Sequence, residues 1–214
     1  MTFLEYLETR QEHLLELTIE HIVIVVEAIV IATVIGLVLG ILTYQTRRPR
    51  EIVLAITGTF LTIPSLALFG LFIVWIGLGT APVLIALVMY ALLPIVRNTI
   101  VGLREVDPSV VESAQGMGMN RVQRLLRIEL PLAWPVVIAG MRVSTLVVLG
   151  IAAIGAYING PGLGNDIFTG LARIGTSTAV YVVLGGMLGI LILAVLFDLL
   201  YVLIFRLTTS RGLR

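Results

Sequence analysis

The 214-residue sequence contains no cysteine and no lysine, and charged residues make up only 13% of it. Without cysteine the chain forms no disulfide and has no thiol chemistry. Without lysine it has no Walker A loop, whose lysine contacts the phosphates of a bound nucleotide. Its two histidines, His13 and His21, lie near the start and form no ligand cluster. No basic patch with interleaved aromatic residues indicates nucleic-acid binding. We therefore predict no catalytic residue, no metal site and no nucleic-acid partner.

Apolar residues dominate what remains. They account for 58% of the chain, and the mean hydropathy is +1.08, whereas a soluble domain has about 25% charged residues. A helix needs about 20 apolar residues to cross a bilayer. The sequence therefore predicts an all-α integral membrane protein, with one membrane domain over residues 21–214 and five transmembrane helices at about 22–44, 52–76, 82–104, 132–157 and 178–205. Pro64 and Pro94 are expected to kink the second and third helices.

The arginines orient these five helices. Eleven of the fourteen lie in segments 47–50, 97–127 and the C-terminal tail, whereas the segments expected on the other side carry only Arg10 and Arg173. Positive residues concentrate on the cytoplasmic side of a membrane protein. We therefore place the N-terminus outside and the C-terminus in the cytoplasm. Residues 1–20, with leucines on one face and glutamates on the other, are expected to form an amphipathic helix at the outer membrane surface.

The longest polar stretch between the apolar runs is 107–131. Asp107 followed by Pro108 is typical of a helix start. Asn120 is suited to cap a second short helix, which Pro131 is expected to end. Between the two, Gly116 and Gly118 weaken the first helix and permit a bend. Arg121, Arg124 and Arg127 are expected to share one face of the second helix, contacting either a protein partner or anionic lipid.

The spacing within this stretch resembles the cytoplasmic signature of ABC-importer permeases, E-A-A, three residues, G, nine residues, I-x-L-P. Glu112, Ser113 and Ala114 are followed after three residues by Gly118, and nine more residues lead to Ile128-Glu129-Leu130-Pro131. Only Ser113 departs from the pattern. The resemblance implies a type I permease fold with a coupling helix between the third and fourth spans, and it gives ATPase-coupling roles to Glu112, Ser113, Ala114, Gly116, Gly118 and Arg121. In this interpretation Ser113 and Ala114 are small so that the partner's groove approaches closely.

The resemblance extends over about 55–175. Segments 62–68, 77–79, 90–108 and 160–164 look like osmoprotectant permeases, which import glycine betaine, choline, carnitine or proline and serve in osmotic stress. A methionine-type amino-acid permease, or a secondary transporter coupled to ions, is the alternative. The resemblance also implies the partners: ABC ATPase subunits that hold ATP and Mg, a second permease copy or a sister permease, an extracytoplasmic solute-binding protein, and membrane lipid. The expected location is the bacterial cytoplasmic (inner) membrane. This chain is expected to bind no cofactor and to be no enzyme.

Two further groups of residues are candidates for function within the membrane. Arg142 and Asp198 are charges inside expected spans, roughly 16 Å and 12 Å from the cytoplasmic ends by helix rise. Their similar depth predicts that they pair or share a polar network. The second group, candidates for the translocation pathway, offers aromatic faces to a cation or polar donors to a carboxylate; it comprises Tyr90, Asn98, Ser144, Thr145 and Tyr157.

Overall fold

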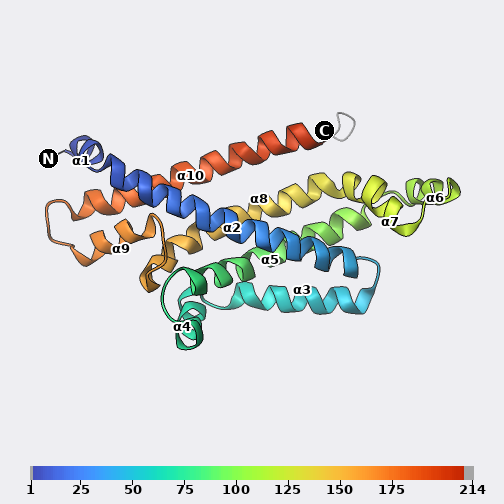
Figure 1. Ribbon diagram of the computed structural model, residues 1–214, viewed down its shortest axis with the longest axis horizontal. Helices are drawn as coiled ribbons and strands as arrows, with labels where there is room; N and C mark the ends of the chain where they lie inside the picture. Colours follow the sequence, from blue (N-terminus) through green and yellow to red (C-terminus); the bar gives the residue numbers. More distant parts are fainter. Residues whose placement is uncertain (1, 210–214) are drawn as a thin grey trace.

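The computed structural model describes residues 2–209, and every regular element in that range is helical. Long helices lie side by side along one axis, with shorter ones at both ends (Figure 1). The elements are α1 (Phe3–Thr9), α2 (Gln11–Thr43), α3 (Arg47–Thr62), α4 (Ser65–Ile76), α5 (Thr80–Arg104), α6 (Pro108–Gly116), α7 (Arg121–Arg124), the π-helical turn η1 (Leu125–Glu129), α8 (Leu130–Gly155), the 3-10 turn η2 (Ala156–Ile158), α9 (Gly164–Ala172) and α10 (Ala179–Thr208).

Helix α5 is the centre of the structure, because α2 and α8 both pack along it. Its buried residues include Ala86, Leu87 and Ile95, and these join the apolar core shared by the long helices. Helices α6 and α7 lie at one end of the molecule, and α1 and α9 lie at the other (Figure 1). The polar stretch 107–131 and the glycine-rich loop near 160 are therefore on opposite sides, as the predicted topology requires.

Small residues let α2 approach α5 closely. Ala28, Ala32, Gly36 and Gly40 follow one another at intervals of four, and all are buried. A Cβ atom added at Gly40 would lie 2.5 Å from the Cγ2 atom of Thr99 on α5. Such small-residue stripes are how helices associate in a membrane, where lipid is as apolar as the side chains and close packing must hold the helices together.

We predict that Gly40→Val separates α2 from α5 and lowers stability by about 1–3 kcal/mol, the usual cost of overpacking. Thermal unfolding of the purified protein in detergent measures it. Gly58→Val on α3 is the matched control, because a Cβ atom there meets nothing within 4 Å. Equal loss for both variants would mean that the cost comes from losing a glycine and not from the α2–α5 contact.

The expected second span, 52–76, is not one straight helix. It is divided into α3 and α4, which meet at an angle of 97°. Pro64 has no N–H to continue the helix, and Ile63 before it takes an extended conformation with ψ 127°. The hydroxyl of Tyr90 donates to the freed carbonyl of Ile63 at 2.6 Å. Pro64 thus has a larger effect than the expected kink, whereas α5 continues through Pro94.

The N-terminal prediction is also wrong in its bounds. No boundary falls at residue 20, because the helix that spans the membrane begins at Gln11 and α1 is a separate short helix. Tyr6 is buried, and its ring lies 6.3 Å from that of Tyr181 on α10, so α1 packs on the protein. The third and fifth predicted spans agree closely with α5 and α10. The glycine-rich segment 160–164 is followed by the short helix α9, which begins at Gly164.

Candidate functional site

Helix α6 forms as its end signals predict. The Oδ1 atom of Asp107 accepts a hydrogen bond from the backbone N–H of Ser109 at 2.8 Å, and this bond holds the pKa of that carboxyl below its usual value. At the other end, Gly118 takes φ +79°, a conformation that favours glycine. The N–H of Met119 then reaches the carbonyl of Ala114 and the N–H of Gly118 reaches that of Gln115, which is a Schellman motif. Both ends of α6 are thus fixed by local chemistry.

The face that α6 leaves free carries Glu112 and Ser113, both exposed, together with Met117, which is 69% exposed. Ala114 points the other way. It is 1% exposed, and α6 packs against α7 and η1. The small side chain of Ala114 therefore permits close approach to the chain's own helices, and not to a partner's groove as predicted from the sequence. Gly116 ends α6 with open space around it.

Pro131 does not end the second helix of this segment. Asn120 caps α7 through a reciprocal capping box with Gln123, but α7, η1 and α8 run on as one helix from Arg121 to Ile158. The reason is the π-helical turn, in which the N–H of Leu130 reaches back to the carbonyl of Leu125. This wider turn takes up the proline ring, which in a regular α-helix presses on the carbonyl four residues earlier. The fourth span thus extends without interruption into the coupling segment.

A buried carboxylate lies at this turn. Glu129 is 3% exposed; its Oε1 atom accepts from Nε of Arg124 at 2.6 Å, and its Oε2 atom accepts from the hydroxyl of Tyr44 at 2.6 Å. Gln45 donates to the Tyr44 oxygen at 2.8 Å and accepts from Arg121 at 3.0 Å. Burial and the neighbouring Glu129 carboxylate raise the pKa of Tyr44 to about 12, so Tyr44 remains a neutral donor at physiological pH. These five residues, here called the Glu129 network, tie the coupling segment to the cytoplasmic end of α2.

Glu129 was not predicted as a functional residue, because it occupies the variable position of the I-x-L-P pattern. A signal was present: it is the only acid among residues 121–131, and Arg124 lies five residues before it. Arg124 consequently faces inward, with 11% of its side chain exposed, whereas Arg127 is exposed. The three arginines therefore do not present one face to a partner or to lipid.

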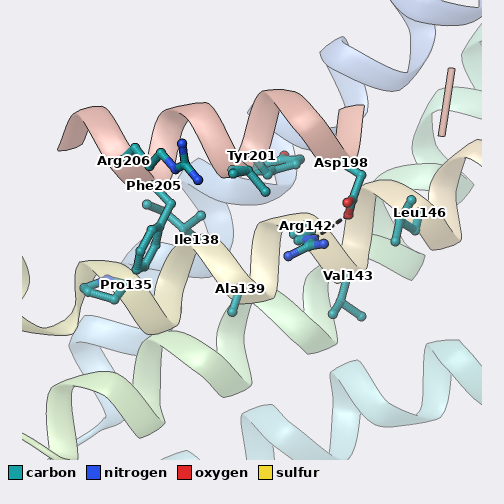
Figure 2. Close-up of a pocket in the computed structure, with 11 residues that line it drawn as sticks. Pro135, Ile138, Ala139, Arg142, Val143, Leu146, Asp198, Tyr201, Phe205 and Arg206 are labelled. Carbon is teal, nitrogen blue, oxygen red and sulfur yellow. Dashed lines mark hydrogen bonds and ion pairs between the residues drawn. The ribbon is translucent and has the colours of Figure 1, made fainter. Parts of the chain in front are cut away.

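The predicted pairing of Arg142 with Asp198 is confirmed. Nε of Arg142 on α8 donates to Oδ1 of Asp198 on α10 at 2.5 Å, with 44% and 35% of the two side chains exposed. Both residues line a groove of about 800 Å³ between the two helices. Figure 2 shows the ion pair bridging α8 and α10 beside the apolar residues of the groove.

We predict that Arg142→Ala and Asp198→Ala are coupled. Removing either partner leaves a charge at the depth of the membrane, whereas removing both does not, so the double variant should lose less stability than the two single variants together. The expected coupling is about 1–3 kcal/mol, typical of contacting residues. A double-mutant cycle on thermal unfolding in detergent measures this coupling, and additive losses would show that the two residues are not energetically coupled.

The pathway candidates are divided between the core and the outer surface. The hydroxyls of Tyr90 and Ser144 are buried and donate to the carbonyls of Ile63 and Ala91. Thr145 is within 2.8 Å of the Tyr201 hydroxyl. Asn98 is half-buried, and Tyr157 is 68% exposed. Their role in a pathway stays a prediction. Among residues 2–209, no group of three or more potential ligands forms a metal site.

Comparison with known proteins decides the family. The family described as "Binding-protein-dependent transport system inner membrane component" matches residues 32–210. The chain belongs to this family. It is thus a multi-pass permease of the inner membrane, and membership implies an ATPase partner and a binding protein. Within residues 2–209, the continuous helix Arg121–Ile158, together with α2, α5 and α10, gives four helices long and apolar enough to span a membrane. The bent pair α3–α4 gives a fifth when it is counted as one span.

Curated relatives cover nearly all of this permease. It is 34% identical over 210 residues to the choline transport system permease protein OpuBB of Bacillus subtilis (strain 168), covering 98% of this chain and 95% of that protein. It is 34% identical to the glycine betaine/carnitine/choline permease OpuCB of the same organism, with 98% and 94% coverage. The osmoprotectant import permease OsmW of Salmonella typhimurium (strain LT2) is 34% identical, with complete coverage of both chains.

Among solved structures, the fold matches a chain of the inward-facing MetNI methionine ABC transporter in its CY5 native crystal form. The TM-score is 0.82 at 24% sequence identity, covering 95% of this chain and 99% of that chain. At this identity the likeness establishes the fold alone. The predicted type I permease fold is therefore confirmed.

Proposed function

We propose that this permease is the transmembrane subunit of an ATP-driven importer for compatible solutes such as glycine betaine, choline, carnitine or proline. The observation that carries the proposal is the similarity to osmoprotectant permeases along the whole chain. The methionine-type alternative has only the shared fold to support it, at 24% identity. The exposed, capped helix α6 on the cytoplasmic side suits docking to an ATPase, and an ion-coupled carrier does not need such a docking helix.

The same proposal includes the partners. Two ATPase subunits hold ATP and Mg, a second permease copy or a sister permease completes the pore, and an external binding protein supplies the solute. This chain itself binds no cofactor and catalyses no reaction. The exposed Glu112 of α6 and the exposed Met117 directly after α6 offer a charge and an apolar anchor to a groove on the ATPase.

The geometry supports a mechanical route from ATPase to membrane. Movement of α6 is passed to α7, and the continuous helix from Arg121 to Ile158 carries it past Arg142 into the membrane. The Glu129 network passes the same movement to α2. Because α8 packs along α5 and contacts α10, a small shift at the cytoplasmic end changes the packing of the whole bundle.

Competition for uptake tests the solute class. The permease is reconstituted in proteoliposomes with its ATPase, binding protein and any sister permease, and uptake of labelled glycine betaine is measured. Unlabelled choline, carnitine and proline are expected to compete, and methionine is the matched control. Inhibition by methionine with none by the other solutes would overturn the proposed class while leaving the family intact.

A further inference from the structure

The Arg142–Asp198 pair lies at a depth of the membrane where contact with lipid acyl chains is energetically unfavourable. Arg142 is eleven residues beyond Pro131, roughly 16 Å along the helix, which is near the middle of a hydrocarbon layer about 30 Å thick. The two side chains nevertheless keep 44% and 35% of their surface exposed. A charge facing acyl chains costs several kcal/mol, and such residues face a bundle interior or a water-filled cavity instead. The groove between α8 and α10 therefore faces water or protein.

The groove has the dimensions and lining of a small-molecule site. Its volume of about 800 Å³ lies within the range of roughly 300–1,000 Å³ common for ligand pockets. Apolar side chains of α8 and α10 form most of its walls, including Ala139, Val143 and Phe205. Two charges of opposite sign, Arg142 and Asp198, stand together in these walls, and Arg206 lines the groove as well.

The ion pair leaves part of each charge for a ligand. Its hydrogen bond uses Nε of Arg142 and Oδ1 of Asp198. The terminal guanidinium nitrogens and the second carboxylate oxygen remain to meet groups of opposite charge. The guanidinium fork suits a carboxylate. The Asp198 carboxylate, with the ring of Phe205 lining the same groove, suits a cation without N–H donors.

We propose that this groove is a membrane-embedded binding site for a small zwitterion, with its carboxylate on Arg142 and its quaternary ammonium beside Asp198. The proposal rests on the proposed function and names the part of this chain that meets the solute. It moves the site away from Tyr90 and Ser144, whose hydroxyls are already bonded inside the bundle. A zwitterion matches two adjacent opposite charges, whereas a solute with only one charge matches half of the site.

The absence of cysteine makes a direct test possible, because a single introduced cysteine is the only thiol in this chain. Ala139→Cys places it in the groove of the complete transporter in lipid nanodiscs. We expect modification by a water-soluble maleimide, slowed about threefold or more by saturating glycine betaine, as an occupied site excludes the reagent. Arg48→Cys, at the exposed start of α3 and outside the spanning part of α2, is the control and should be modified at the same rate with and without glycine betaine.

Three results with the Ala139→Cys variant would overturn the site. They are an unreactive thiol, modification of the thiol at the same rate with and without glycine betaine, and crosslinking of the introduced thiols of two permeases, which would make the groove an interface between copies. Uptake by the same preparations is measured in parallel. Normal ATP-driven uptake without protection would refute the site alone, whereas absent uptake of every osmoprotectant would refute the proposed function.

A second variant separates binding from structural support. Arg142→Gln removes the proposed partner of the solute's carboxylate. Uptake of glycine betaine should therefore fall about tenfold or more, which is the effect expected from losing a charged hydrogen bond. Choline has no carboxylate, and its uptake should fall less than about threefold. A residue with only a structural role would reduce both equally, and that result would contradict the assignment. Arg97→Gln, outside the groove, is the control.

Discussion

Glu112→Arg is expected to abolish solute-stimulated ATP hydrolysis while the permease still inserts and folds. Glu112 is exposed on α6, away from the buried Ala114, so its replacement disturbs no internal contact. If α6 docks on the ATPase, the introduced arginine would face ATPase groups that bind the carboxylate of Glu112, and the two would repel each other. Leaving a charge unpaired in an interface costs about 2–5 kcal/mol, which corresponds to a loss of association of roughly 30-fold or more.

ATPase activity in proteoliposomes, with and without glycine betaine and its binding protein, measures this effect. Glu51→Arg is the matched control, since it makes the same charge change on α3, where Glu51 meets only the exposed Arg47. Co-purification of the ATPase distinguishes lost assembly from lost turnover. Retained stimulation in Glu112→Arg would show that α6 does not dock through this face.

Glu129→Ala is expected to cause the largest loss of stability of any single change in the coupling segment. It leaves the guanidinium of Arg124 without its partner in a site where only 11% of that side chain is exposed. It also removes the acceptor of the buried Tyr44 hydroxyl. Breaking a buried ion pair by removing one partner costs about 3–5 kcal/mol. Thermal unfolding should therefore occur at a markedly lower temperature.

Two companion variants show whether the Glu129 network positions α6 or only stabilises the fold. Tyr44→Phe removes the hydrogen bonds of the hydroxyl to Glu129 and from Gln45 and should cost about 1–3 kcal/mol, because the carboxylate keeps Arg124. A positioning role predicts that this mild variant still uncouples: basal ATP hydrolysis stays, and stimulation by solute falls. Unchanged stimulation in Tyr44→Phe would reduce the network to a structural element. Glu105→Ala, an exposed acid preceding α6, serves as control.

Features set by local chemistry could be read from the sequence. Asp107 and Asn120 cap helices, and Gly118 ends one with a positive φ, because each depends on atoms a few residues away. The pairing of Arg142 with Asp198 followed from helix rise, which places both residues at a similar depth. Opposite charges at one depth in a membrane are expected to pair, because an unpaired charge there is energetically costly. The third and fifth spans followed from the long apolar runs, and the coupling segment followed from its resemblance to the ABC-importer signature.

Features set by distant contacts could not be read. Glu129 meets Tyr44 across 85 positions of sequence, and the side of α6 on which Ala114 lies depends on how α6 packs against α7. Pro131 was expected to end a helix, but a π turn five residues long admits it. Pro64 separates α3 from α4. The angle of 97° between these two helices does not follow from any rule about proline.

The central claim is that this permease moves solute only when a partner hydrolyses ATP. The most direct measurement is uptake of labelled glycine betaine into proteoliposomes that contain the permease with its ATPase and binding protein, with ATP supplied on the ATPase side. Uptake against a gradient that stops when ATP is omitted, or when the ATPase carries an inactivated catalytic site, is the expected result. Uptake that continues without ATPase, driven by a proton or sodium gradient, would contradict the account and make Arg142 and Asp198 ion-coupling residues.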